Sequence, residues 1–210
     1  NYRKIRLNHI MLETLTLPIA AIVVAYLIGS LSSAIILCKL AGLPDPRSEG
    51  SGNPGATNVL RIGGKKLAAT VLFIDVVKGA LPVTIVSLAG FDLAWVTATA
   101  FAVFLGHLYP VFFQFKGGKG VATALGGFLA LSPLLGGAIL LSWLLVFIIS
   151  RISSLSAIIA ASLAPLYSMW LINSLEARWI IFVMTTMLLI RHKSNIKRLL
   201  SGEESNLKQD

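Results

Sequence analysis

Residues 120–150 of this 210-residue chain read GVATALGGFLALSPLLGGAILLSWLLVFIIS and contain no charged side chain. A membrane-spanning helix needs roughly 20 consecutive apolar residues, so this stretch is too long for one helix and long enough for two. Ser132-Pro133, near its middle, and Gly136-Gly137, which follow, are typical of a helix end and a tight turn. The stretch therefore predicts two short helices that cross a membrane in opposite directions.

Uncharged stretches recur on both sides, at residues 14–38, 93–115 and 152–175. Only 13% of the residues are charged, whereas soluble domains carry roughly 25%. The composition therefore excludes a soluble fold and predicts an all-α, polytopic integral membrane protein. We expect about seven transmembrane helices, at residues 15–38, 67–89, 93–113, the two halves of 120–150, 154–172 and 179–190. The last of these is short and would span only with tilting or local thinning of the bilayer.

The basic residues predict how this bundle is oriented. With seven crossings, nearly all Lys and Arg side chains fall on one side, which the positive-inside rule makes the cytoplasm. The N-terminus is then outside and the C-terminus cytoplasmic. The net charge of +9 favours contact with anionic membrane lipids. Because the charges are scattered between spans and form no single face, the chain is not expected to bind nucleic acid.

The same pattern predicts one domain with two short extensions. Residues 1–13 are expected to be a leader, either disordered or foreign to the native protein. Residues 14–200 form a single membrane-embedded domain, and residues 201–210 form a polar C-terminal tail. No oligomeric state follows from the sequence.

The longest polar stretch inside the chain contains the glycine-rich string GSGNPGATNV at residues 50–59. Gly50, Gly52 and Gly55 allow the backbone to approach a ligand closely. Small side chains that form hydrogen bonds lie between and after these glycines. An arginine follows, and its guanidinium can bind a phosphate through two hydrogen bonds. These side chains are Ser51, Asn53, Thr57, Asn58 and Arg61. The string predicts a phosphate site, and the alternative is a surface loop made of turn residues.

A second glycine-basic string, FKGGKGV, occupies residues 115–121. Gly117, Gly118 and Gly120 can expose backbone N–H groups at the start of a helix, where anions bind readily. Lys116 and Lys119 add full positive charge. The string is not a Walker A loop, and alone it is a weak signal because basic loops are common beside membranes. Its weight comes from lying on the same predicted side as the first string.

A few charged or titratable residues fall inside or beside the spans. Asp75 and Lys78, three residues apart, are expected to form a structural ion pair, with Asp75 as a general base the alternative. His107 either packs between helices or faces the site. His192, in the basic tail, has Asn195 three residues later. The sequence shows neither an HEXXH motif nor a Cys/His cluster, so no metal is expected. Ser153, Ser154 and Ser156 are expected to cap a helix, to line the site or to do both, with capping favoured.

Six segments together closely resemble the bacterial acyl-phosphate:glycerol-3-phosphate acyltransferases of the PlsY type. They are AYLIGS (25–30), GSGNPGATNVLR (50–61), DVVKG (75–79), GHLYPVF (106–112), FKGGKGVAT (115–123) and RHKSNIKR (191–198). The resemblance covers residues 20–204, and the string over 50–61 is its most specific part.

The resemblance implies a seven-helix enzyme of the bacterial inner membrane whose active site faces the cytoplasm. It implies acyl transfer from acyl phosphate to glycerol 3-phosphate, which gives lysophosphatidic acid and inorganic phosphate in the first acylation step of phospholipid synthesis. No cofactor is implied. The implied catalytic residues are Ser51, Arg61, Lys119, His192 and Asn195. The implied substrate-binding residues are Gly52, Asn53, Thr57, Asn58, Gly117, Gly118, Gly120 and Ser154.

The chemistry of acyl phosphate is compatible with these residues. A mixed anhydride has a good leaving group, so positioning two anionic substrates and stabilising the oxyanion can supply most of the acceleration without a covalent intermediate. No side chain is an evident base, so we expect the acyl phosphate itself to accept the proton, with His192 as the alternative. The alternative function is a transporter or flippase for a phosphate ester. It predicts polar residues along several spans, whereas here most polar groups gather at one side.

Overall fold

The computed structural model describes residues 2–204, with side chains for residues 15–204, and every regular element in that range is helical. This confirms the predicted all-α fold. The elements are α1 (Tyr2–Gly29), α2 (Ser33–Leu40), α3 (Ala56–Leu88), α4 (Leu93–Leu108), a 3₁₀ turn η1 (Val111–Phe113), α5 (Val121–Leu131), α6 (Pro133–Ser150), α7 (Ser153–Leu171), α8 (Leu175–Arg191) and α9 (Lys193–Leu200).

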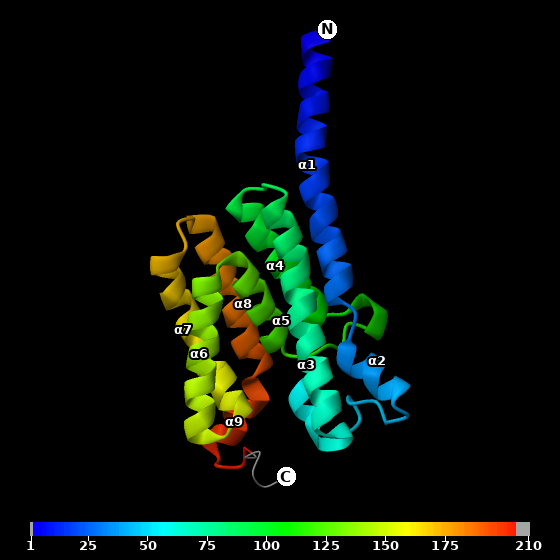
Figure 1. Ribbon diagram of the computed structural model, residues 1–210, viewed down its shortest axis with the longest axis vertical. Helices are drawn as coiled ribbons and strands as arrows, with labels where there is room; N and C mark the ends of the chain where they lie inside the picture. The colour runs from blue at the N-terminus through cyan, green and yellow to red at the C-terminus, as the bar shows by residue number, and fades with distance from the viewer. Residues whose placement is uncertain (1, 205–210) are drawn as a thin grey trace.

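The long helices lie side by side, with the start of α1 at one end of the molecule and α9 at the other (Figure 1). Helix α5 packs between α3, α4 and α6, while α7 packs against α6 and α8. The predicted break at Ser132-Pro133 is confirmed: α5 ends at Leu131 and α6 begins at Pro133, where the Ser132 hydroxyl caps the new helix by accepting from the Leu135 N–H at 3.3 Å.

The described helices are those of a multi-pass membrane protein. By length and apolarity α3, α6, α7 and the helical stretch from Leu93 to Phe113 each suffice to span a bilayer, and α1 with α2 makes a fifth span if the bent pair counts as one. Large apolar side chains cover outward faces of these helices, among them Phe73 of α3 and Ile149 of α6. Helices α5 and α8 are shorter than 18 residues, so seven crossings and their orientation stay a prediction.

The first predicted span, residues 15–38, is not one continuous helix. Helix α1 ends at Gly29, and the chain bends by 40° before α2 begins at Ser33. The Leu31 carbonyl in this break accepts a hydrogen bond from the Lys78 ammonium at 2.9 Å. Because a break inside a membrane must have its freed backbone groups satisfied, a side chain far along the sequence makes this break possible.

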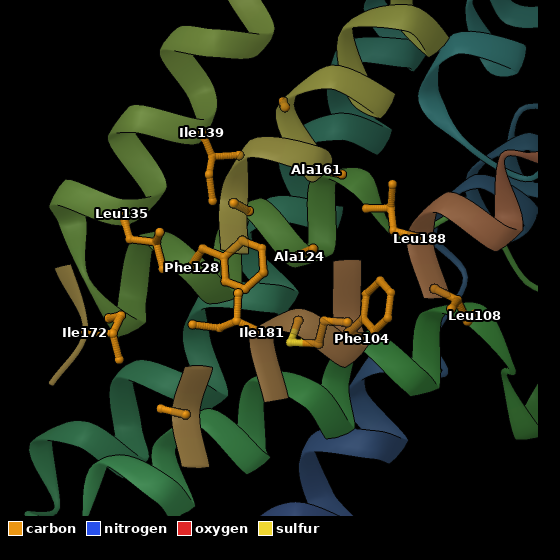
Figure 2. Packing of buried hydrophobic residues seen from close by; sticks show 14 residues of the cluster. Phe104, Leu108, Ala124, Phe128, Leu135, Ile139, Ala161, Ile172, Ile181 and Leu188 are labelled. Carbon is orange, nitrogen blue, oxygen red and sulfur yellow. The ribbon is translucent and has the colours of Figure 1, made fainter. Parts of the chain in front are cut away.

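Apolar side chains from α4 to α8 form the main core. Figure 2 shows Phe128, Leu135 and Ile181, from α5, α6 and α8, gathered close together. Close helix contact depends on glycine: a Cβ added at Gly126 of α5 would collide with the Val76 carbonyl oxygen of α3. Small residues that let backbones approach are typical of helix packing in membranes.

Candidate active site

A cavity of about 1080 Å³ lies among α3, α5, α6, α7, α8, α9 and the first glycine-rich loop. One part of its lining is polar and the rest is apolar, with the side chains of Phe128, Ile139 and Trp143 among the latter. The structure brings ten of the thirteen predicted site residues to this lining: Ser51, Asn53, Thr57, Asn58, Arg61, Lys119, Gly120, Ser154, His192 and Asn195. Gly52, Gly117 and Gly118 are not part of it.

Three helices begin at this cavity. Its lining includes the first residues of α3, α5 and α7, with the residues just before two of them: Gly55, Ala56, Thr57, Gly120, Val121, Ala122, Ser153 and Ser154. The first N–H groups of a helix have no partner within the helix, and the helix dipole makes this end partly positive. Three such ends at one cavity, with Arg61, Lys119 and Arg198 beside them, make it suited to anions.

The first glycine-rich loop is folded around one buried side chain. The Asn58 amide nitrogen donates to the carbonyl oxygens of Pro46, at 2.8 Å, and Glu49, at 3.0 Å. Its oxygen accepts from the Ser51 N–H at 2.9 Å, and the residue is 1% exposed. The side-chain amide of Asn58 therefore bonds to backbone groups of its own loop. This geometry fits a residue that holds the loop in shape better than one that binds phosphate.

The other residues of this loop have different surroundings. Thr57 lies in the first turn of α3, and its hydroxyl is 3.3 Å from the Ser153 hydroxyl at the start of α7. Gly52 has φ +66° and serves a turn in which its N–H donates to the Glu49 carbonyl oxygen. The predicted binding role of Gly52 therefore has no support in this geometry.

The glycine-basic loop is held from two sides. The Arg191 guanidinium donates to the carbonyl oxygens of Gly117, at 2.7 Å, and Gly118, at 3.1 Å, and lies over the Tyr109 ring. The Gly118 N–H donates to the His107 carbonyl oxygen at 3.1 Å. Gly117 and Gly118 therefore shape the loop, and the Gly118 N–H is already used, so a direct phosphate contact through it would require this bond to break.

Lys119 belongs to a network of charged and amide groups. Its ammonium donates to the Asn195 side-chain oxygen at 2.5 Å, and the Asn195 amide nitrogen donates to Glu204 at 2.6 Å. Glu204 also accepts from the Ser154 hydroxyl and from Arg198, each at 2.6 Å. Burial lowers the pKa of Lys119 to about 8, an effect that the Glu204 carboxylate partly offsets.

Glu204 is the residue that the sequence analysis missed. The expected boundary of the polar tail at residue 201 separates it from the domain, whereas the structure places its carboxylate in the cavity lining. Residues 205–210 of that tail lie outside the described range. Ser154 lines the site, whereas the capping favoured for these serines is wrong, because the N-cap residue of α7 is Ile152 and no side chain caps the helix.

His192 lies at the junction of α8 and α9 and is 2% exposed. Its Nδ1 is 2.8 Å from the Leu188 carbonyl oxygen, which can only accept, so Nδ1 carries the proton and Nε2 has the lone pair. Burial lowers the pKa of His192 to about 4, although the bond to Leu188 opposes this. The imidazole is therefore neutral near pH 7.

The buried charges lie at the edge of the same cavity. The predicted ion pair is confirmed, with the Lys78 ammonium 2.8 Å from Asp75, and Asp75 also accepts from the Ser33 hydroxyl at 2.8 Å. Asp75 and His107 both belong to the cavity lining. Within the described side chains, no group of three or more His, Cys, Asp or Glu is arranged to hold a metal ion.

Comparison with known proteins places these residues in context. The sequence model of the family described as Glycerol-3-phosphate acyltransferase matches residues 19–202. Glycerol-3-phosphate acyltransferases of Shewanella sp. strain W3-18-1 and Shewanella oneidensis are each 54% identical, over 198 and 196 residues, covering 93% of this chain and 96% of the relative.

Two solved structures are also similar. Both are crystal structures of PlsY (YgiH), an integral membrane glycerol 3-phosphate acyltransferase. The glycerol 3-phosphate form has a TM-score of 0.86 and 40% identity, and the lysophosphatidic acid form 0.83 and 39%. Each alignment covers 90% of this chain and 94% of the other.

Proposed function

Because the chain belongs to the glycerol-3-phosphate acyltransferase family, we propose that it transfers a fatty acyl group from acyl phosphate to glycerol 3-phosphate. The glycerol 3-phosphate hydroxyl oxygen bonds to the acyl carbonyl carbon and the bond from that carbon to the phosphate oxygen breaks. The hydroxyl proton ends on the released phosphate, and the products are lysophosphatidic acid and inorganic phosphate.

One observation supports this proposal: a single cavity is lined by basic side chains and helix starts in one part and by apolar side chains in another. The starts of α3, α5 and α7 and the Arg61 and Lys119 side chains line the polar end, while Leu125, Phe128 and Ile139 line the apolar end. A substrate that is part phosphate and part acyl chain matches both ends. Holding two anions and an acyl chain in one orientation supplies catalysis by positioning and by electrostatic stabilisation of the oxyanion.

The predicted site residues divide into roles on this proposal. Arg61 and Lys119 stabilise phosphate charge and the oxyanion, with Ser51, Asn53 and Thr57 as hydrogen-bonding partners of phosphate. Asn195 and His192 place the glycerol 3-phosphate hydroxyl. Gly120, at φ +86°, is the N-cap residue of α5 and lines the cavity together with the first residues of that helix. Ser154 orients Glu204.

The experiment uses the purified full chain in detergent with acyl phosphate and glycerol 3-phosphate, with and without EDTA. We expect phosphate release and lysophosphatidic acid formation that depend on both substrates and survive EDTA. Phosphate release without glycerol 3-phosphate would instead identify a hydrolase. Product made only from acyl-CoA or acyl carrier protein would contradict acyl phosphate as the donor, and loss of activity in EDTA would contradict metal independence.

Lys119 and Lys116 offer a matched pair of variants in the same loop. Lys119 lines the cavity, whereas Lys116 is exposed and does not. Removing a charged hydrogen bond costs about 1.5–3 kcal/mol, so Lys119→Gln is expected to lower kcat/KM by roughly 10- to 100-fold. Lys116→Gln should leave it unchanged. Equal effects of the two would show that only the general charge of the loop matters.

The acyl phosphate is expected to accept the proton itself. The Nε2 lone pair of His192 is the alternative acceptor because the imidazole is neutral. Under substrate assistance His192→Ala raises KM for glycerol 3-phosphate and retains turnover. A fall in kcat by several orders of magnitude with an unchanged KM would assign the proton to His192.

The proposed location is the bacterial inner membrane with the cavity open to the cytoplasm. In a Cys38→Ser background, single cysteines at the exposed Glu49 and Lys116 should react with a membrane-impermeant maleimide only after cells are opened. A cysteine at Asp92, in the loop between α3 and α4, should react in intact cells with a permeable outer membrane. The reverse pattern would overturn this orientation.

A further inference from the structure

Four buried polar side chains meet between α2, α3 and α4, and two of them, Asp75 and His107, line the cavity. Asp75 pairs with Lys78 at 2.8 Å, accepts from Ser33 at 2.8 Å and lies 3.7 Å from Nδ1 of His107. None of the four is more than 8% exposed. We call Ser33, Asp75, Lys78 and His107 the buried polar cluster.

This cluster is expensive to keep in a membrane protein. Charged groups at such depth are paired or functional, and replacing a buried ion pair by apolar side chains is often neutral or stabilising. Stability alone therefore explains the cluster poorly. Its contacts to the glycine-basic loop and to the break before α2 offer a better explanation.

One arm of the cluster reaches the glycine-basic loop through His107. Since Nδ1 of His107 lies on the Asp75 side, Nε2 lies at the other edge of the ring, where a Cβ added at Gly118 would collide with it. The His107 carbonyl oxygen also accepts from the Gly118 N–H at 3.1 Å. The same histidine thus bonds to Gly118 through its backbone and packs its ring against it, immediately before Lys119.

The other arm reaches the first loop through the break between α1 and α2. Ser33 is the first residue of α2, and the Lys78 ammonium holds the Leu31 carbonyl in the break at 2.9 Å. Helix α2 leads directly into the first glycine-rich loop. The two loops also approach each other here, because a Cβ at Gly118 would be 3.2 Å from the Pro54 carbonyl oxygen.

We propose that the buried polar cluster positions the two glycine-rich loops against each other, and that His107 is a positioning residue for the glycerol 3-phosphate end of the site. This rests on the proposed function. Because the Lys119 ammonium bonds to Asn195, a shift at Gly118 changes the groups that hold glycerol 3-phosphate. Among the described residues, no hydrogen bond or ion pair of the four side chains runs to α6 or α7, which line much of the acyl end.

The test measures steady-state kinetics of purified variants with each substrate varied in turn. His107→Leu keeps the backbone bond to Gly118 but removes the ring nitrogens that face Asp75 and Gly118, so KM for glycerol 3-phosphate should rise about tenfold, with kcat changed by less than about threefold. KM for acyl phosphate should stay unchanged. His107→Gln, which keeps a polar group at the ring position, should recover at least half of the loss.

Ser33 and Ser32 supply the matched control. The Ser33 hydroxyl donates to Asp75, whereas the Ser32 hydroxyl, also buried, makes no hydrogen bond to the described residues. Ser33→Ala should raise KM for glycerol 3-phosphate about threefold, and its effect should not add to that of His107→Leu because the two act through Asp75. Ser32→Ala should match the wild type.

Each outcome decides the proposal. A cluster with a merely structural role would lower thermal stability and kcat while both KM values stay at wild type, and this result would overturn the proposal. If His107→Leu does not fold, His107→Gln and Ser33→Ala carry the same test. Wild-type protein without glycerol 3-phosphate-dependent activity would count against the proposed function instead, since the variant comparison requires an active parent.

Discussion

The Lys119 ammonium lies 2.5 Å from the Asn195 side-chain oxygen, joining residues 76 positions apart in the sequence. Glu204 holds the amide nitrogen of Asn195 and thereby turns its oxygen toward Lys119. Arg198, in turn, holds Glu204 from α9. The loop before α5 and the tail after α8 are thus joined by one chain of charge-assisted hydrogen bonds, which fixes both at the cavity before substrate arrives.

The first prediction concerns pH. Lys119 loses its proton in the free enzyme as pH rises through about 8, whereas the unfolded chain keeps it to its ordinary value of 10.5. In the role proposed for Lys119 its charged form binds phosphate, so kcat/KM should fall as pH rises above about 8. Bound phosphate favours the charged form of Lys119, so kcat should begin to fall at a higher pH than kcat/KM does. Rate–pH profiles check this, and a profile flat to pH 10 would contradict it.

The same shift makes a stability prediction of opposite sign. Between about pH 8 and 10.5 the unfolded chain binds more protons at Lys119 than the folded protein does, so this residue makes the free energy of unfolding rise with pH. Lys119→Met should remove this contribution. Thermal unfolding in detergent at pH 7.5 and 9.5 measures the difference in stability between wild type and Lys119→Met. This difference should be smaller at pH 9.5 than at pH 7.5.

A third prediction uses Glu204 and its neighbour. Glu204→Gln leaves Arg198 without its carboxylate and weakens the hold on Asn195, so kcat/KM should fall about tenfold, the value of one charged hydrogen bond. Glu203 also lines the cavity, but its carboxylate accepts from the Ser201 hydroxyl and not from the Lys119 network, so Glu203→Gln is the control and should stay within about twofold of wild type. Equal losses would mean that tail charge alone matters.

The fourth prediction separates two asparagines of the first loop. Asn58→Ala leaves the Ser51 N–H and two carbonyl oxygens without their partner and should cost about 1–3 kcal/mol of stability per buried group. Its melting temperature should drop together with activity. Asn53→Ala should keep the melting temperature and raise a substrate KM. Normal stability in Asn58→Ala would show that the loop is held by other contacts.

The fifth prediction tests the close contact between α3 and α5. Gly126→Ala forces a methyl group against the Val76 carbonyl oxygen and should destabilise the protein by about 1–3 kcal/mol. At Gly137 of α6 an added Cβ meets nothing within 4 Å. Gly137→Ala should be neutral or stabilising by up to about 1 kcal/mol. Thermal unfolding in detergent compares the two.

Sequence reasoning succeeded where the cause of a feature is local. The break at Ser132-Pro133 follows from proline geometry and a serine cap, so the sequence alone predicts it. The bend after Gly29 was missed because Lys78, on another helix, stabilises the freed carbonyl of Leu31. No pattern within residues 15–38 could reveal that partner.

The candidate site also has features that the sequence predicts and features that it does not. Glycine, asparagine and basic residues mark the two loops, but the sequence does not distinguish a residue that contacts ligand from one that folds the loop. Asn58 and Gly118 belong to the second kind by their contacts. Glu204 was missed because an acidic residue after a basic helix looks like ordinary surface. The one signal in the sequence was that Glu204 is among the few acidic residues that follow a strongly basic segment.

The starts of α3, α5 and α7 give this cavity a positive potential that no titration and no single side-chain substitution can remove. A lysine loses its positive charge in alkaline solution, whereas the peptide dipoles of a helix keep their direction at every pH. Affinity for phosphate should accordingly decline in steps as cations are deleted one after another, and a weak residual attraction should persist after the last of them is gone.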